Sequence, residues 1–180
     1  MPYSAADRDT PEDTASETSF IPGPDTAGAF REALGHFPTG ITIVTTMGTE
    51  GPEGFTANSF ASVSLDPPLV LWSPARASSR FDTFANARHF AIHLLGDRDA
   101  GLAARFARGG LGFGGLIHDT TVEGTPVIPG TLARFDCVQH ATHDGGDHVI
   151  VLGRVLRCAQ RKGAPLVFSR GAYGVFNPAD

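Results

Sequence analysis

Hydroxyl and amide side chains gather in two stretches of this 180-residue chain and indicate where a polar ligand would bind. The first stretch is an expected strand, residues 55–65, with polar side chains at alternate positions and therefore on one face. These side chains are Thr56, Asn58, Ser62 and Ser64. The second stretch follows a short apolar run and contains Ser73, Ser78 and Ser79.

Beside Pro38-Thr39-Gly40, such groups suit a neutral polar ring system joined to a phosphate. Arg76 or Arg80 is available to balance the phosphate charge. By composition alone, however, polar decoration of a solvent-exposed strand is the simpler interpretation.

Two other motifs suggest different chemistry, and their surroundings argue against both. Gly110 to Gly115 matches the G-x-G-x-x-G pattern of dinucleotide loops, but a helix is expected before it and no long helix after it. His140, His143 and His148 are residues that can bind a metal, yet the first two have opposite parity in a strand and point to opposite faces. We therefore expect a surface loop at the glycines and no metal site.

The elements that position these groups are short and mostly extended. An apolar stripe predicts a helix from about Ala27 to Phe37, and Ser78 or Ser79 and Asp97 are placed to cap two more. About seven strands are expected, over residues 41–47, 55–65, 69–72, 90–95, 132–141, 148–158 and 166–168. The turn between Asp144 and Asp147 predicts that two of them form a hairpin. This pattern favours a mostly β fold, a small closed barrel with a few short flanking helices.

The charge of the chain is concentrated at its beginning. Residues 1–25 hold six acidic side chains and one basic side chain, which account for the net charge of −5. We expect this acidic stretch to be a disordered N-terminal tail and residues 26–180 to form the domain. The remainder has no basic stripe for nucleic acid, and no stretch is apolar enough to span a membrane. A soluble cytoplasmic protein is expected, with Cys137 and Cys158 as buried free thiols.

Four segments in this order resemble the flavin reductase-like family, the reductase components of two-component flavin monooxygenases. They are Phe37-Pro-Thr-Gly-Ile-Thr-Ile-Val-Thr-Thr46, Thr56-Ala-Asn-Ser-Phe-Ala-Ser-Val-Ser-Leu-Asp-Pro-Pro-Leu-Val70, Gly146-Asp-His-Val-Ile-Val-Leu-Gly-Arg-Val155 and Pro165-Leu-Val-Phe-Ser-Arg-Gly-Ala-Tyr173. The resemblance covers Phe30 to Phe176 and implies an FMN-binding split β-barrel.

The resemblance also implies a set of binding residues. Those expected at the flavin ring and ribityl chain are Thr39, Gly40, Thr56, Ala57, Asn58, Ser59 and Ser62. The loop after the next strand implicates Ser73, Ser78 and Ser79 at the phosphate, although Trp72-Ser-Pro-Ala-Arg-Ala-Ser-Ser79 departs from the commoner family pattern. The Gly-Asp-His motif places His148 at the nicotinamide, with Tyr173 as a second candidate.

The function implied by the resemblance is NADH-dependent reduction of FAD or FMN, with NADPH the less favoured donor. Hydride transfer between aligned cofactors needs no catalytic side chain. A homodimer is implied, and so is a partner monooxygenase that receives the reduced flavin. Two alternatives stay open: a split-barrel enzyme that keeps its flavin and acts on an organic substrate, and a non-catalytic flavin-binding module.

Overall fold

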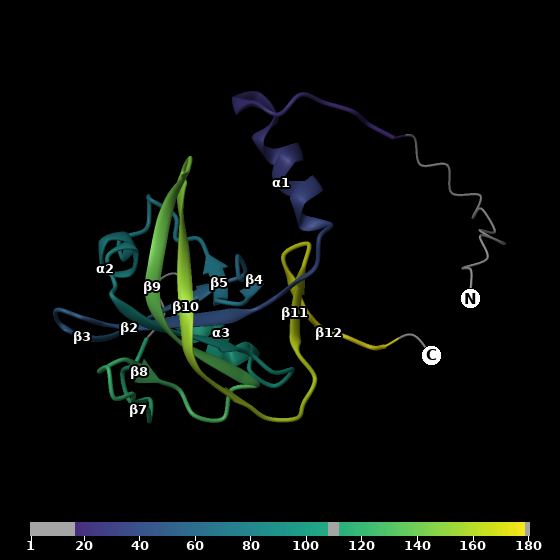
Figure 1. The fold of residues 1–180 in the computed structure, drawn as a ribbon. Coiled ribbons are helices and arrows are strands. Elements are labelled where there is room, and N and C mark those ends of the chain that lie inside the picture. Colours follow the sequence, from purple (N-terminus) through teal and green to yellow (C-terminus); the bar gives the residue numbers. More distant parts are fainter. Residues whose placement is uncertain (1–16, 108–111, 179–180) are drawn as a thin grey trace. The chain divides into compact units, whose positions relative to one another are not determined.

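The computed structural model describes residues 17–107 and 112–178 (Figure 1). The chain divides into two units, one ending at Leu34 and one beginning at Gly35. The first unit contains a 3-10 helix, Pro24–Thr26, and most of α1, Ala27–Gly35. All the strands belong to the second unit. Most of the expected tail, residues 1–16, lies outside the described residues.

Strands dominate the second unit, so the expected mostly β class is confirmed. The strands are β1 (Thr39–Gly40), β2 (Thr42–Gly48), β3 (Gly51–Ala57), β4 (Ala61–Leu65), β5 (Pro68–Trp72), β6 (His89–Leu94), β7 (Asp119–Thr120), β8 (Pro126–Val127), β9 (Ala133–Gly145), β10 (His148–Gln160), β11 (Leu166–Ser169) and β12 (Ala172–Val175). The helices are α2 (Phe81–Ala85) and α3 (Ala100–Phe106).

Seven strands form the main sheet in the order β3-β2-β6-β9-β10-β5-β4, and all neighbours are antiparallel. β1, β11 and β12 form a separate three-stranded sheet, and β7 pairs with β8. β9 and β10 form the expected hairpin, in which His148 pairs with Gly145. Gly146 has a φ of 75° in the turn, a conformation that glycine adopts without strain.

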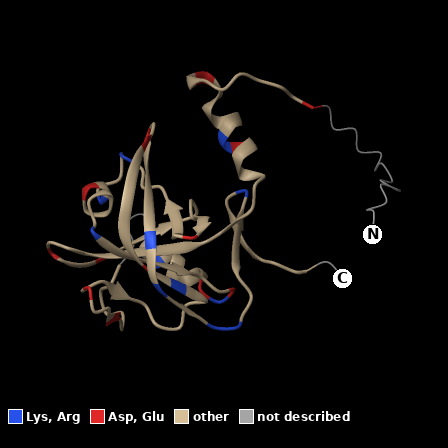
Figure 2. Cartoon of the chain, in the orientation of Figure 1, with Lys and Arg blue, Asp and Glu red and all other residues tan. Residues whose placement is uncertain are grey.

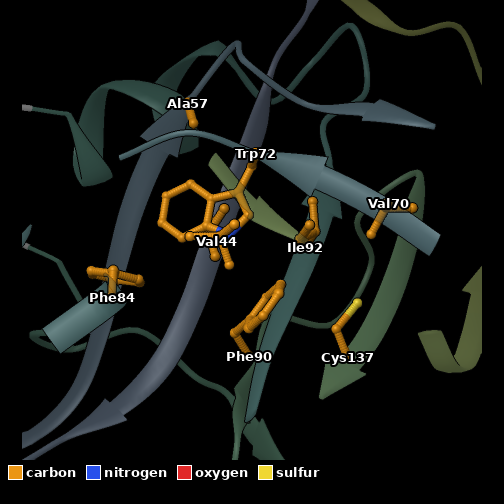
Figure 3. Close-up of a cluster of buried hydrophobic side chains, with 9 residues drawn as sticks. Val44, Ala57, Val70, Trp72, Phe84, Phe90, Ile92 and Cys137 are labelled. Atoms are coloured by element: carbon orange, nitrogen blue, oxygen red, sulfur yellow. The ribbon is translucent and has the colours of Figure 1, made fainter. Parts of the chain in front are cut away.

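The main sheet curls around an aromatic cluster. β3 and β5 are five strand positions apart, so in a flat sheet they would lie about 24 Å from each other. The rings of Phe55 on β3 and Trp72 on β5 are nevertheless 6.1 Å apart. Phe84 of α2 contacts both rings edge-on, at 5.9 and 5.7 Å, and closes the cluster. Figure 3 shows Phe84 and Trp72 within it. Curvature of this kind brings the ends of distant strands together.

One predicted strand is wrong. Residues 55–65 were expected to run as one strand with a polar face, but β3 ends at Ala57 and β4 begins at Ala61. β3 pairs with β2, whereas β4 pairs with β5 at the other edge of the sheet. The chain therefore crosses between the two sheet edges at Asn58–Phe60, and an irregularity between Ser62 and Ser64 breaks the alternation further. The polar face expected from sequence does not exist as one surface.

The two cysteines differ in environment. Cys137 is buried in the aromatic cluster, and burial raises the pKa of its thiol to about 12. Cys158 is exposed in the single chain, contrary to expectation. No helix within residues 17–107 and 112–178 is both long and apolar enough to cross a membrane.

Candidate ligand-binding site

The start of β2 and the end of β3 bring the first two groups of candidate residues together. Thr42 pairs with Ala57, and the Thr42 hydroxyl donates to the Ala57 carbonyl at 2.8 Å. Because the strands are antiparallel, residues before Thr42 lie beside residues after Ala57. The ladder ends at this pair, so Thr39-Gly40 and Asn58-Ser59 leave it at the same end, the first to pair with β11 and the second to cross to β4.

A serine pair connects this region to the loop after β5. The Ser59 hydroxyl accepts a hydrogen bond from the Ser73 amide at 2.9 Å and lies 3.3 Å from the Ser73 carbonyl. This pair holds the β3–β4 crossing against the loop that contains Ser78 and Ser79. The Ser78 hydroxyl accepts from the Arg80 amide at 3.2 Å, at the start of α2. The hydroxyl-rich loop is thus ordered by contacts within the protein.

The same loop pairs with the turn of the β9–β10 hairpin. Ala75 and His148 form an isolated antiparallel bridge. On either side of it, the Arg76 amide donates to the Asp147 carbonyl at 2.9 Å and the Val149 amide donates to the Pro74 carbonyl at 3.1 Å. The fold therefore places the candidate nicotinamide residue His148 against the candidate phosphate loop.

His148 is oriented by its neighbour in the chain. Its Nδ1 lies 2.7 Å from Asp147 Oδ1. The hydrogen bond from His148 lowers the pKa of Asp147 below its usual value. An ionised Asp147 accepts a hydrogen bond from Nδ1–H, and in the neutral tautomer that carries this proton Nε2 of the half-exposed ring is a hydrogen-bond acceptor.

In the three-stranded sheet, Phe168 on β11 lies between Thr39 on β1 and Tyr173 on β12. Thr39 pairs with Phe168, and Phe168 pairs with Tyr173. Directly opposed residues of antiparallel strands share a face, and the Phe168 and Tyr173 rings lie 5.7 Å apart. Phe168 is thus a contact of the site that sequence reasoning missed, because its strand was expected but its partner strands were not.

The side chain of Thr39 offers a buried hydroxyl that the described part of the protein does not use. Its Oγ1 is buried and has no hydrogen-bond partner among the described residues. A buried hydroxyl without a partner is destabilising by about 1–3 kcal/mol, so such groups are uncommon unless a ligand or water completes them. A polar ligand atom beside Thr39 would supply that partner.

Not every candidate can contact a ligand through its side chain. Ala57 points into the aromatic cluster, and the Thr56 hydroxyl donates to the Ala103 carbonyl of α3 at 2.7 Å. At these two positions, contact with a ligand would involve the backbone or the remaining acceptor capacity of Thr56. The candidate side chains that remain exposed are those of Asn58, Ser62, Ser79 and Tyr173.

Both arginines proposed for phosphate charge are engaged by the protein. Arg80 donates to the Gly54 carbonyl at 2.6 Å and stacks over Phe55, with its guanidinium carbon 4.9 Å from the ring centre. Arg76 donates to Asp144 and to the Gly146 carbonyl. Arg80 therefore connects the start of α2 to β3, and Arg76 connects the loop after β5 to the β9–β10 turn.

Of the two rival motifs, the structure describes only the histidine group in full. In residues 17–107 and 112–178, no group of three or more histidine, cysteine and acidic side chains is arranged to hold a metal. The glycine-rich stretch from Gly110 to Gly115 begins outside the described residues.

Comparison with known proteins gives consistent results. Residues 34–177 match the flavin reductase like domain. The chain is 57% identical over 162 residues to FMN reductase (NADH) SmoA of Agrobacterium fabrum, covering 90% of this chain and 93% of that one. It is 38% identical over 151 residues to the flavin-dependent monooxygenase reductase subunit HsaB of Rhodococcus jostii, covering 83% and 77%.

Solved structures have the same fold. Nitrilotriacetate monooxygenase component B from Mycobacterium thermoresistibile superposes with a TM-score of 0.79 at 38% identity, covering 87% of this chain and 92% of that one. The NADH:FAD oxidoreductase SgcE6 of Streptomyces globisporus, in complex with NAD and FAD fragments, gives a TM-score of 0.81 at 34% identity, covering 89% and 98%. The barrel is of the split type, as the resemblance implied. The chain belongs to the flavin reductase-like family.

Proposed function

We propose that this protein is an NADH-dependent flavin reductase that passes reduced flavin to a partner monooxygenase. The observation that carries the proposal is the bridge between Ala75 and His148, which joins the candidate flavin-phosphate loop to the candidate nicotinamide residue. A reductase needs both cofactors in contact, and this pairing fixes the protein segments that would hold them at one location. The 57% identity to an enzyme named FMN reductase (NADH) supports the same function.

We assign the flavin ring and ribityl chain to the region where β1, β2 and the β3–β4 crossing meet. The residues proposed there are Thr39, Gly40, Thr56, Ala57, Asn58, Ser59 and Ser62. The phosphate is assigned to Ser73, Ser78 and Ser79, whose loop leads into α2. His148 is assigned to the nicotinamide, with Tyr173 on the far side of Phe168 as a second contact.

Bound flavin and NADH supply the redox chemistry, a direct hydride transfer from C4 of the nicotinamide to N5 of the flavin. The protein aligns the two rings and excludes water, so no side chain is assigned as a catalytic acid or base. The unpartnered Thr39 Oγ1 fits this role, because a flavin edge has both donors and acceptors for such a hydroxyl. Asp147 holds the His148 ring in one orientation through Nδ1.

We also propose that the protein acts as a homodimer in the cytoplasm. Several large apolar side chains are exposed in the single chain, among them Val63 and Leu65 on the edge strand β4 and Val175 on β12. An exposed edge strand with apolar residues favours association with a second copy. NADH is an intracellular reductant, which favours the cytoplasm.

The test is oxidation of NADH by purified protein with FAD, with FMN and without flavin. We expect turnover that saturates with free flavin, and the ratio of the two rates gives the preferred flavin. Turnover with NADPH alone would refute the choice of donor. If flavin stays bound in a one-to-one ratio through purification and added flavin changes nothing, the enzyme instead keeps its flavin and acts on another substrate. Flavin binding without turnover would identify a binding module.

A further inference from the structure

The outer part of the β9–β10 hairpin extends beyond the rest of the sheet. β6 pairs with β9 only as far as Val138, and β5 pairs with β10 only from Val151 to Arg154. Residues 140–150 are here called the hairpin arm. Their partners in the sheet are residues of the opposite strand of the same hairpin. Figure 1 shows this arm rising past the neighbouring strands. A two-stranded ribbon is marginally stable by itself, so the position of its turn depends on contacts made at the tip.

The described contacts at the tip come from the loop after β5, and one residue makes most of them. Arg76 Nε donates to the Gly146 carbonyl at 3.0 Å, and Arg76 Nη2 donates to Asp144 Oδ1 at 2.7 Å. The Arg76 amide donates to the Asp147 carbonyl at 2.9 Å. Arg76 thus contacts three of the four residues from Asp144 to Asp147, and Figure 2 shows the acidic residues gathered at this tip.

The geometry of the guanidinium is essential to this arrangement. Nε and Nη2 lie on the same edge of a planar group and donate in parallel to two acceptors on the turn. The guanidinium carbon also lies over the Phe81 ring, 5.8 Å from the ring centre. An ammonium group would retain the charge but could not reproduce this two-pronged contact. The exposed ion pair with Asp144 contributes little by charge alone, because Arg76 is 45% exposed and Asp144 81% exposed.

From these contacts we infer that Arg76 is a positioning residue, which holds the hairpin arm so that His148 meets the nicotinamide beside the flavin-phosphate loop. This inference rests on the proposed function, and it assigns Arg76 to the alignment of NADH rather than to binding of phosphate. His148 lies directly after the turn that Arg76 holds, and its bridge to Ala75 is the next backbone contact along the loop. Loss of the side chain would leave the backbone bridge but free the turn to move.

The experiment measures steady-state kinetics of Arg76→Ala and Arg76→Lys with NADH and flavin varied separately. Both variants are expected to raise KM for NADH about fivefold, which corresponds to the loss of one or two partly exposed charge-assisted hydrogen bonds. Both are expected to change KM for flavin less than about twofold. Asp144→Asn keeps an acceptor oxygen and is expected to raise KM for NADH about twofold at most. The exposed arginine Arg98, just before α3, provides the control variant Arg98→Ala, with no change expected.

The outcomes separate three cases. An increase in the flavin KM with the NADH KM unchanged would make Arg76 a phosphate ligand and overturn the inference. Unchanged kinetics in both alanine and lysine variants would also overturn it. A melting temperature within about 3 °C of the parent protein is expected, because a surface contact of this kind contributes at most about 1 kcal/mol. Failure of the unmodified protein to oxidise NADH with any flavin would reject the proposed function itself, irrespective of Arg76.

Discussion

Acidification is expected to destabilise this protein through one buried histidine. His93 on β6 is fully buried, its Nδ1 lies 3.0 Å from the Ile43 carbonyl, and its Nε2 accepts a hydrogen bond from the Ile128 amide at 3.0 Å. Both ring nitrogens are therefore used by the backbone, and only the neutral ring satisfies both. Burial lowers the pKa of His93 from 6.5 to about 4.

The sign and size of the effect follow from that pKa. The unfolded chain binds a proton at His93 below about pH 6.5, whereas the folded protein does not bind it until about pH 4. The free energy of unfolding therefore falls as the pH falls through this window. Linkage gives a loss of about 2 kcal/mol between pH 7 and pH 5, and about 3 kcal/mol in total.

Urea unfolding at a series of pH values measures this loss. The matched variant is His93→Gln, which cannot titrate and keeps an amide near the two backbone groups. We expect the parent protein to lose about 2 kcal/mol more than the variant between pH 7 and pH 5, even though the variant is less stable overall. Parallel curves for the two proteins would refute the argument, since other titrating groups contribute equally to both.

Three further outcomes are expected. A Cβ at Gly54 would overlap the Phe106 ring, so Gly54→Ala should lower the free energy of unfolding by about 1–3 kcal/mol. At Gly101 on α3 a Cβ meets nothing within 4 Å, so Gly101→Ala should raise the free energy of unfolding by about 0.5–1 kcal/mol. Urea titration measures both changes. Thr39→Val removes the buried unpartnered hydroxyl, so KM for flavin should rise about fivefold while thermal stability stays level or improves; a loss of stability with an unchanged flavin KM would contradict this. His148→Gln should raise KM for NADH about tenfold and leave KM for flavin within twofold, and an equal effect on both would argue against its assignment to the nicotinamide.

The sequence predicted the longer strands well. β2, β6, β9 and β10 contain β-branched and apolar runs, and the Asp-Gly-Gly-Asp turn between the last two has a strong local signal. The two-residue strand β1 has no periodicity of its own and exists only because Thr39 and Gly40 pair with β11. No local pattern could have revealed it.

Long-range pairing also explains the main error. Residues 55–65 alternate correctly for one strand, but the curled sheet has two edges, and this segment supplies a strand to each. Long-range contacts also explain why the side chains of Thr56 and Ala57 do not face the candidate site as expected. Their side chains are used by α3 and by the aromatic cluster, neither of which is adjacent in sequence. Alternation predicts which residues share a face but not what the face contacts.

The placement of the candidate residues follows from where the strands end. Asn58 and Ser59 follow β3, Ser73 follows β5, and Asp147 lies in the β9–β10 turn. At such points backbone groups leave the sheet ladder and become available to a ligand, while the adjoining strands remain rigid. In the site that we propose, the barrel provides the rigidity and the strand ends provide the donors and acceptors. The turn before His148 is the exception, because its two strands extend beyond the sheet, and it is there that Arg76 supplies the missing support.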